Sequence, residues 1–294
     1  KENPFGAMIQ GCNSAVYIGG SIFQEPKIPM KMDWFLNEHS FVIGANFGPC
    51  ETKFYYERIE ALLKEMEGVC FRDKYSYEKF SSLGHIKYAA DVLFCVNHYY
   101  QIKPKETSEK RLFISLMDFS VSHPELEEYM PAYYDFMQKR VAEALKGNIE
   151  VVLSSFCEPE GDENAVNHIL ESLSAEDRKK VQVVNYNGFN EAEVLQNIAN
   201  SDVVIGTRFH SMIFGLLYGK KVIPVCYSKK HQEVLNDMGI KADDVITVKN
   251  LKEQSGRLTV CRLTKEQKEE LEKSAEEQFF AFDSWRERKL EKSL

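Results

Sequence analysis

Arg208 and His210 are the residues of this sequence best placed to act on a ligand. They follow residues 203–205, a β-branched run that predicts a buried strand of a parallel sheet and ends at Gly206. Thr207 is expected to cap the next helix, which puts Arg208 and His210 in its first turn. Ligands of open α/β sheets bind beyond the carboxyl ends of the strands, and helix N-termini attract anions. This position therefore predicts an anion site, above all for phosphate.

Both residues also have a structural interpretation. Arg208 would then pair with a carboxylate, and His210 would be a hydrogen-bonded histidine of the core. The position favours a functional role for His210, because a side chain in the first turn of a helix lies beside unpaired backbone donors.

Arg72 is a second candidate, because it follows the apolar run 69–71. Asp73 is expected to cap a helix over residues 74–82, which leaves Arg72 at the end of a strand. Arg72 can bind an anion there. The structural alternative is a surface ion pair with Asp73 or Glu78.

Lys229 and Lys230 form a third basic cluster, together with His231. They follow the strand expected over residues 222–226 and, with Tyr227, belong to the same sheet edge as the anion site. The alternative is a solvated basic turn.

Gly19, Gly20 and Asn46 form a weaker signal near the N-terminus. They follow strand-like segments, over residues 15–18 and 41–45. Glycines let a backbone come close to a ligand, and Asn46 can hydrogen-bond one, although an ordinary turn explains the same residues.

Several common motifs are missing from the sequence. It holds no GxGxxG, GxxxxGK[ST] or CxxC, so dinucleotide, P-loop and zinc sites are not indicated. The acidic segment with Glu158, Glu160, Asp162 and Glu163 is expected to be a solvated loop and helix start, with a metal site as the minor alternative. No metal ion or cofactor is expected.

The composition is that of a soluble globular protein. The chain has 294 residues, 44% apolar and 28% charged, with a net charge of −8, which argues against general nucleic-acid or anionic-membrane binding. No apolar run approaches the roughly 20 residues that span a bilayer. Seven singly scattered cysteines indicate a reducing, cytoplasmic compartment. The chain opens with KENPFGAM, without an initiator Met or a signal-peptide pattern, so we expect an N-terminal piece to be missing.

Short β-rich runs alternate with helical stretches, which predicts an α/β fold of two Rossmann-like domains with mostly parallel sheets. Strands are expected at 15–18, 41–45, 69–71, 92–96, 111–116, 149–155, 181–186, 202–206, 222–226 and 244–248. Helices are expected at 53–67, 74–82, 125–146, 163–173, 190–199, 208–218, 231–238 and 264–290. The polar linker 101–110 separates a domain over 1–105 from one over 106–262, and the segment 263–294 is expected to pack back on the first.

In these motifs the chain resembles the polysaccharide pyruvyl transferase family. The matching segments are Gly19-Gly20-Ser21, 44–49, 71–84, Ala90-Asp91, 201–206, 208–211 and 224–230, followed by Leu235 and Gly239-Ile240. The family usually has three glycines where this chain has Ile18-Gly19-Gly20, and its N-terminal strand and glycine-bearing loop are absent here. Part of the acceptor side is therefore expected to lie outside this sequence.

The resemblance implies a GT-B-like arrangement and the transfer of the enolpyruvyl unit of phosphoenolpyruvate to a sugar as a cyclic ketal. The sugar would belong to a cell-surface polysaccharide or its lipid-linked precursor, with peripheral membrane association possible in principle. By motif, Arg72, His210 and Lys230 match positions that handle phosphoenolpyruvate. We expect His210 to be the acid and base. The expected donor-binding residues are Arg72, Lys230, Arg208, Thr207 and Ser211, and the expected acceptor-binding residues are Gly19, Gly20 and Asn46.

Two other functions fit the same features. A GT-B-type glycosyltransferase or nucleotide-sugar epimerase would have the same fold and the same anion site at a helix N-terminus. A non-catalytic sugar- or phosphate-binding protein would bind ligand without releasing phosphate. The acceptor sugar, its carrier and the oligomeric state are not indicated by the sequence.

Overall fold

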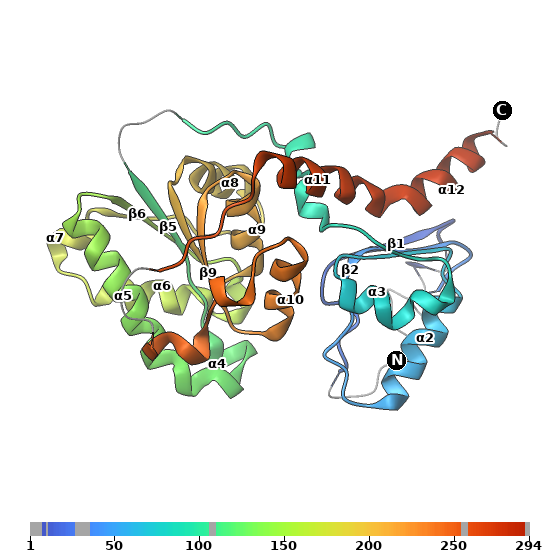
Figure 1. Ribbon diagram of the computed structural model, residues 1–294, viewed down its shortest axis with the longest axis horizontal. Coiled ribbons are helices and arrows are strands. Elements are labelled where there is room, and N and C mark those ends of the chain that lie inside the picture. The colour runs from blue at the N-terminus through green and yellow to red at the C-terminus, as the bar shows by residue number, and fades with distance from the viewer. Residues whose placement is uncertain (1–7, 10, 27–35, 106–109, 254–257, 292–294) are drawn as a thin grey trace. The chain divides into compact units, whose positions relative to one another are not determined.

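The computed structural model describes residues 8–9, 11–26, 36–105, 110–253 and 258–291 (Figure 1). The chain divides into two compact units. The first combines Lys1–Cys95 with Glu269–Leu294, and the second is Val96–Lys268. The boundaries expected from the sequence were residues 105 and 262.

The first unit is built on a parallel sheet whose described strands have the order β1-β2-β3-β4. Its elements are β1 (Ala15–Ile18), β2 (Ser40–Ala45), α2 (Lys53–Lys64), β3 (Gly68–Phe71), α3 (Lys74–Phe80), the 3-10 helix η2 (Ser81–Leu83) and β4 (Ile86–Tyr88). The 3-10 helix η3 (Val92–His98) and the helix α11 (Lys265–Glu276) cross the unit boundaries, and η8 (Glu277–Phe279) and α12 (Phe280–Glu291) complete the unit.

Both faces of this sheet are covered, as expected for parallel strands with near-continuous apolar runs. Val42 of β2 belongs to the core formed with Ile59 of α2. On the other face, Phe41 packs against Phe282 of α12, with ring centroids 5.4 Å apart. Gly68 is required there, because a Cβ would lie 2.4 Å from the Cβ of Ala281. The C-terminal segment thus covers the face opposite α2.

Two sequence-based assignments in this unit were wrong. Residues 92–96, expected as a strand, form part of η3, whose start is fixed by the Asp91 carboxylate accepting the Leu93 N–H at 3.0 Å. The expected helix 264–290 is interrupted by η8, where the buried Gln278 amide accepts the Gly44 N–H and donates to Ala89 O. In both cases a polar side chain bonds to the backbone and sets the local conformation.

The second unit holds a larger parallel sheet, whose described strands have the order β10-β9-β8-β5-β6-β7. Its elements up to β8 are β5 (Arg111–Ser115), α4 (Phe119–Ser122), η4 (Pro124–Tyr129), α5 (Met130–Lys146), β6 (Glu150–Ser154), η5 (Glu158–Glu160), α6 (Asp162–Glu171), α7 (Ala175–Arg178), β7 (Val181–Val183), α8 (Glu191–Asn200) and β8 (Val203–Gly206). There follow α9 (Phe209–Leu217), β9 (Lys221–Cys226), α10 (Lys229–Asp237), η6 (Ala242–Asp244), β10 (Ile246–Thr247) and η7 (Val248–Glu253).

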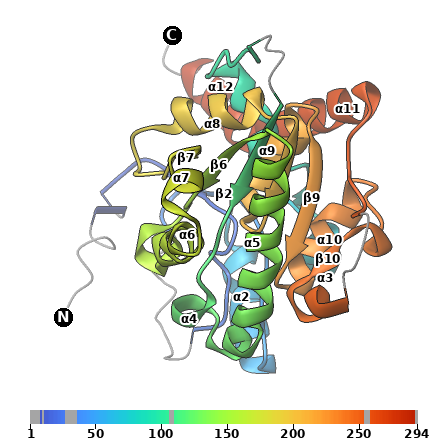
Figure 2. The same cartoon turned by 90° about the vertical axis from the view of Figure 1, so that its left-hand side faces the viewer.

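Right-handed crossovers place the helices of this unit on two faces of its sheet. The chain moves from β5 to β7 with α5 and α6 on one face, and from β8 to β10 with α9 and α10 on the other. Contacts of α5 with α6 and β6, and of α9 with α8, β8 and β9, agree with this division. Figure 2 shows α5 crossing the near face of the sheet. Within the described part of the chain, no helix combines the length and the apolarity needed to cross a membrane.

Candidate functional site

The topology of the second unit singles out one place at its sheet edge. The chain order reverses between β5 and β8, which are hydrogen-bonded neighbours. Ligands of open α/β sheets bind outside the carboxyl ends of the strands at such a switch point. The segments that follow β5 and β8 here begin with Leu116 and Thr207.

Ser115, the last residue of β5, ties these two segments together. Its Oγ accepts the N–H groups of Thr207, at 3.1 Å, and Arg208, at 3.3 Å. Its own proton is then donated to Ser211 Oγ, because that hydroxyl in turn donates to Arg208 O at 2.7 Å. Ser115 and Ser211 are buried. The hydrogen bonds of both hydroxyls in this network are thus made to other groups of the protein.

Thr207 is also engaged inside the protein. Its hydroxyl bonds to the Tyr133 hydroxyl at 2.9 Å, and that hydroxyl accepts the Met117 N–H at 3.1 Å. Thr207 and Tyr133 are buried, and burial raises the pKa of the Tyr133 hydroxyl. The helix α9 begins at Phe209, with Arg208 rather than Thr207 as its N-cap residue.

The donor-binding roles expected for Thr207 and Ser211 stay predictions, and the structure shows that both side chains are engaged inside the protein. Their hydroxyls, and the backbone N–H of Thr207, are satisfied inside the protein and have no exposed surface. The sequence showed polar residues at the start of a helix, but it did not show that Ser115 would take up the nearby N–H groups.

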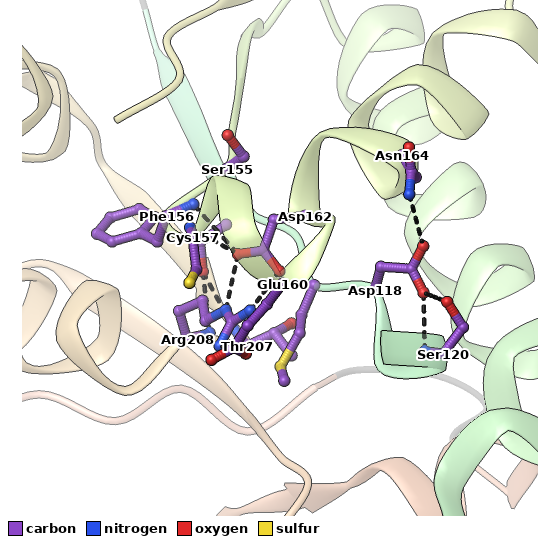
Figure 3. Close-up of polar contacts among 12 residues, drawn as sticks. Asp118, Ser120, Ser155, Phe156, Cys157, Glu160, Asp162, Asn164, Thr207 and Arg208 are labelled. Carbon is purple, nitrogen blue, oxygen red and sulfur yellow. Dashed lines mark hydrogen bonds and ion pairs between the residues drawn. The ribbon is translucent and has the colours of Figure 1, made fainter. Parts of the chain in front are cut away.

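Arg208 is held by two carboxylates from the segment that follows β6 (Figure 3). Its Nε donates to Asp162 Oδ2 at 2.7 Å, its Nη2 donates to Asp162 Oδ1, and its Nη1 donates to Glu160 Oε2 at 2.6 Å. Arg208 is 9% exposed. Burial lowers the pKa of Arg208, but the bonds and charges of Asp162 and Glu160 outweigh it, so the pKa lies above its usual value.

Asp162 is a buried structural carboxylate and not part of a solvated loop. It is 0% exposed, and it also accepts the N–H groups of Phe156, at 3.2 Å, and Cys157, at 3.0 Å. As the first residue of α6 it also interacts favourably with the helix dipole. The expectation of a solvated acidic segment was wrong for this residue, because Arg208 compensates the cost of burying its charge.

His210 and Lys230 occupy the first turns of two neighbouring helices. His210 is exposed in α9, and Lys230 is half-buried in α10, which begins at Lys229 and not at residue 231 as expected. The strands β8 and β9, which precede these helices, are paired. His231 is buried between Phe209, with ring centroids 5.4 Å apart, and Tyr227, at 4.4 Å. This aromatic contact holds the two helix starts together.

Arg72 is the centre of a separate cluster in the first unit. It follows β3, is 9% exposed, and donates from Nη1 to Asp91 at 2.7 Å and from Nη2 to Asn46 Oδ1 at 3.2 Å. Gly20 lies against the guanidinium, since a Cβ there would be 2.2 Å from Nη2.

The helix after Arg72 begins as expected. Asp73 caps α3 by accepting the Ser76 N–H at 2.8 Å. The sequence suggested Asp73 or Glu78 as a partner of Arg72, and the structure shows a buried ion pair with Asp91.

The structure thus brings Gly20, Asn46 and Arg72 into contact, although the sequence assigned the first two to the acceptor and Arg72 to the donor. Gly19 follows β1, has φ 155°, and donates its N–H to Ile43 O at 3.3 Å. Arg72 belongs to the first unit, and His210 and Lys230 belong to the second.

Sequence reasoning missed Ser115, Asp91 and the pair formed by Asp162 and Arg208. A signal was present for Asp91, which lies in a matching segment, and for Asp162, an acidic residue shortly after a strand. The sequence gave no signal for Ser115, because a serine at the end of an apolar strand is common.

The comparisons with known proteins agree with this architecture. The family model described as polysaccharide pyruvyl transferase matches residues 3–229. In fold, the chain is similar to S. aureus MnaA in its co-structure with UDP, at 9% identity and a TM-score of 0.57, over 85% of this chain and 68% of that one. It is also similar to a protein of Listeria monocytogenes named as a candidate UDP-N-acetylglucosamine 2-epimerase, at 9% identity and a TM-score of 0.52, over 92% of this chain and 72% of that one.

At such identities the likeness concerns the fold alone, and it confirms the expected α/β architecture with two parallel sheets. No curated protein sequence matches the chain. The family match covers both Arg72 and the segment from Thr207 to Ser211, and it confirms the resemblance derived from the sequence. The chain belongs to the polysaccharide pyruvyl transferase family.

Proposed function

We propose that this protein transfers the enolpyruvyl unit of phosphoenolpyruvate to two hydroxyls of a saccharide, giving a pyruvate ketal and inorganic phosphate. One observation carries the assignment of the reacting group. Of the five residues from Thr207 to Ser211, only His210 is exposed. The other four are buried, so His210 is the side chain of this segment that a substrate can reach without displacing another residue.

The donor is a small molecule with a phosphate and a carboxylate, and it needs several converging cationic groups. Arg72 can bind one of these anions with its planar guanidinium, and Lys230 can act as a point charge. We propose that Arg72, His210 and Lys230 each act on the donor, the roles that their family motifs imply. The buried Asn46 amide supports a ligand role for the Arg72 cluster, because its Nδ2 finds no hydrogen-bond partner among the described residues.

His210 would move the protons of the reaction. In its protonated form it gives a proton to C3 of the donor, which becomes a methyl group, while C2 becomes electrophilic. A sugar hydroxyl forms a bond to C2 and passes its proton to the now neutral imidazole. The C2–O bond to phosphate then breaks, and a second hydroxyl closes the ketal, its proton leaving with the phosphate. A phosphate dianion bound beside an imidazole favours its protonated form, so donor binding would promote the acid.

The test measures phosphate release and ketal formation from phosphoenolpyruvate over a panel of free and lipid-linked saccharides. We expect His210→Ala to lower turnover by about 10²–10⁴-fold while donor binding, followed by thermal shift, is kept. His168→Ala is the matched control, because His168 is also exposed but lies in the last turn of α6. Unchanged turnover of His210→Ala would reject the assignment.

The same thermal-shift assay addresses the alternative suggested by the fold. A nucleotide-sugar enzyme would be stabilised by UDP-sugars and not by phosphoenolpyruvate. That result would refute the proposed donor, whatever the phenotype of the His210 variant.

A further inference from the structure

Three segments meet around the Arg208 guanidinium at the switch point of the second unit. Glu160 and Asp162 come from the segment after β6, and both bond to Arg208. The helix α4, which follows β5, lies against η5, the turn that holds Glu160. The Glu160 carboxylate therefore lies where this topology places a ligand.

The two carboxylates are held very differently, as Figure 3 shows. Asp162 is 0% exposed and takes four donors, namely two guanidinium nitrogens and two backbone N–H groups. The Glu160 side chain is 36% exposed and accepts a hydrogen bond from Arg208 Nη1. Asp162 is thus a fixed part of the fold. Glu160 makes an ion pair at the surface, of the kind that contributes little to stability.

Charge balance gives a second reason to distinguish Glu160 from Asp162. Arg208 carries one positive charge and faces two carboxylates, and the bond from Arg208 keeps the pKa of Glu160 below its usual value in spite of burial. The group as a whole has a net charge of −1. An anionic ligand is repelled from this group unless one carboxylate moves away from Arg208. Glu160 can move away while the buried ion pair between Asp162 and Arg208 stays intact.

We infer that Glu160 occupies the position on Arg208 Nη1 that an anionic group of the ligand takes, and that the ligand displaces it. Glu160 then sets the affinity of the site and selects for ligands that carry a carboxylate or phosphate, since a neutral group cannot replace its charge. That the anion belongs to phosphoenolpyruvate rests on the proposed function. The displacement itself concerns any anion that binds at Arg208.

The experiment compares Glu160→Gln with Glu158→Gln by calorimetric titration. Glu158 belongs to the same 3-10 turn and is exposed, so its variant removes the same charge without touching Arg208. The probes are phosphoenolpyruvate and inorganic phosphate, each titrated separately. We expect Glu160→Gln to bind them about three- to tenfold more tightly than the wild type, and Glu158→Gln to bind them like the wild type. Glu160→Ala, which removes the side chain entirely, should behave like Glu160→Gln.

Several results would overturn the inference. They are unchanged or weaker binding by both Glu160 variants, an equal gain in Glu158→Gln, or no anion binding by any of these proteins. The failure of the proposed function looks different. In that case phosphoenolpyruvate yields no phosphate with any saccharide, while inorganic phosphate still binds more tightly to Glu160→Gln than to Glu158→Gln.

Discussion

Replacing Gly20 by alanine should displace the Arg72 guanidinium. The added Cβ would lie 2.2 Å from Nη2, 2.5 Å from Cζ and 2.8 Å from Nη1. Non-bonded atoms of this kind are comfortable at roughly 3.5 Å, so one group must move by about 1 Å. The far end of an arginine can usually move, but here Asp91 and Asn46 hold it in a site where it is 9% exposed.

The structure sets the size of the effect. A shift of about 1 Å lengthens the Nη1–Asp91 bond from 2.7 Å to a distance at which no hydrogen bond remains. A hydrogen bond to a charged group contributes about 1.5–3 kcal/mol, so we expect Gly20→Ala to lower the free energy of unfolding by about 2 kcal/mol. If Arg72 binds the donor, the same shift should raise the KM for phosphoenolpyruvate at least about tenfold and leave kcat nearly unchanged, the pattern of a lost binding interaction.

Urea unfolding and steady-state kinetics measure these two effects. Gly147→Ala is the matched control, because Gly147 has φ −85° at the end of α5 and a Cβ there would come no closer than 3.4 Å to any neighbour. Equal stability and equal KM in the two variants would show that Arg72 relaxes freely, and would refute the argument that Gly20 positions it.

Three further predictions concern the second unit. Asp162→Asn should lower the free energy of unfolding by about 3–5 kcal/mol in urea, because Arg208 loses its fully buried charge partner and keeps only the partly exposed Glu160; a smaller loss than that of Glu160→Gln would contradict this view. Tyr133→Phe should cost about 1–3 kcal/mol in the same assay, because the buried Met117 N–H loses its acceptor, and a neutral result would show that another group replaces it. The pKa of Glu160 is lowered, so its stabilising effect is complete above about pH 4.5 and is lost as the pH falls through the folded-state pKa. Thermal melts of the wild type should therefore fall more steeply between about pH 5 and 3 than those of Glu160→Gln, and parallel curves would exclude this contribution.

Strand positions were predictable where composition alone decides them. Residues 203–205 and 222–225 are apolar and largely β-branched, and they form the central strands β8 and β9. The short edge strand β4 was missed, because three residues with one buried position give almost no periodic signal. The neighbouring apolar segment 92–96 was predicted as a strand instead, since a short apolar run does not distinguish a strand from a buried helical turn.

The site was predictable in its location but not in its pairing. The sequence placed Arg208 beyond a strand end, where the structure has it, because strand ends follow from local patterns. Its partner Asp162 lies 46 residues earlier in the chain, and only the strand order brings the segments after β6 and β8 close enough to bond. Arg72 shows the same limit, because its partner Asp91 lies 19 residues later in the chain.

The most instructive difference concerns the backbone donors near the start of α9. A helix N-terminus was expected to offer its N–H groups to an anion, but Ser115 accepts those of Thr207 and Arg208. Backbone amides contribute less to the attraction of an anion here than the sequence suggested. Side chains must therefore supply more of the attraction for an anion. Lys230 and Arg208 would supply it in different ways. Lys230 is a half-buried point charge on α10, whereas Arg208 can offer Nη1 only when Glu160 leaves it. The selectivity of the site for strong anions therefore depends on an exchange between carboxylates rather than on a preformed cradle of amides.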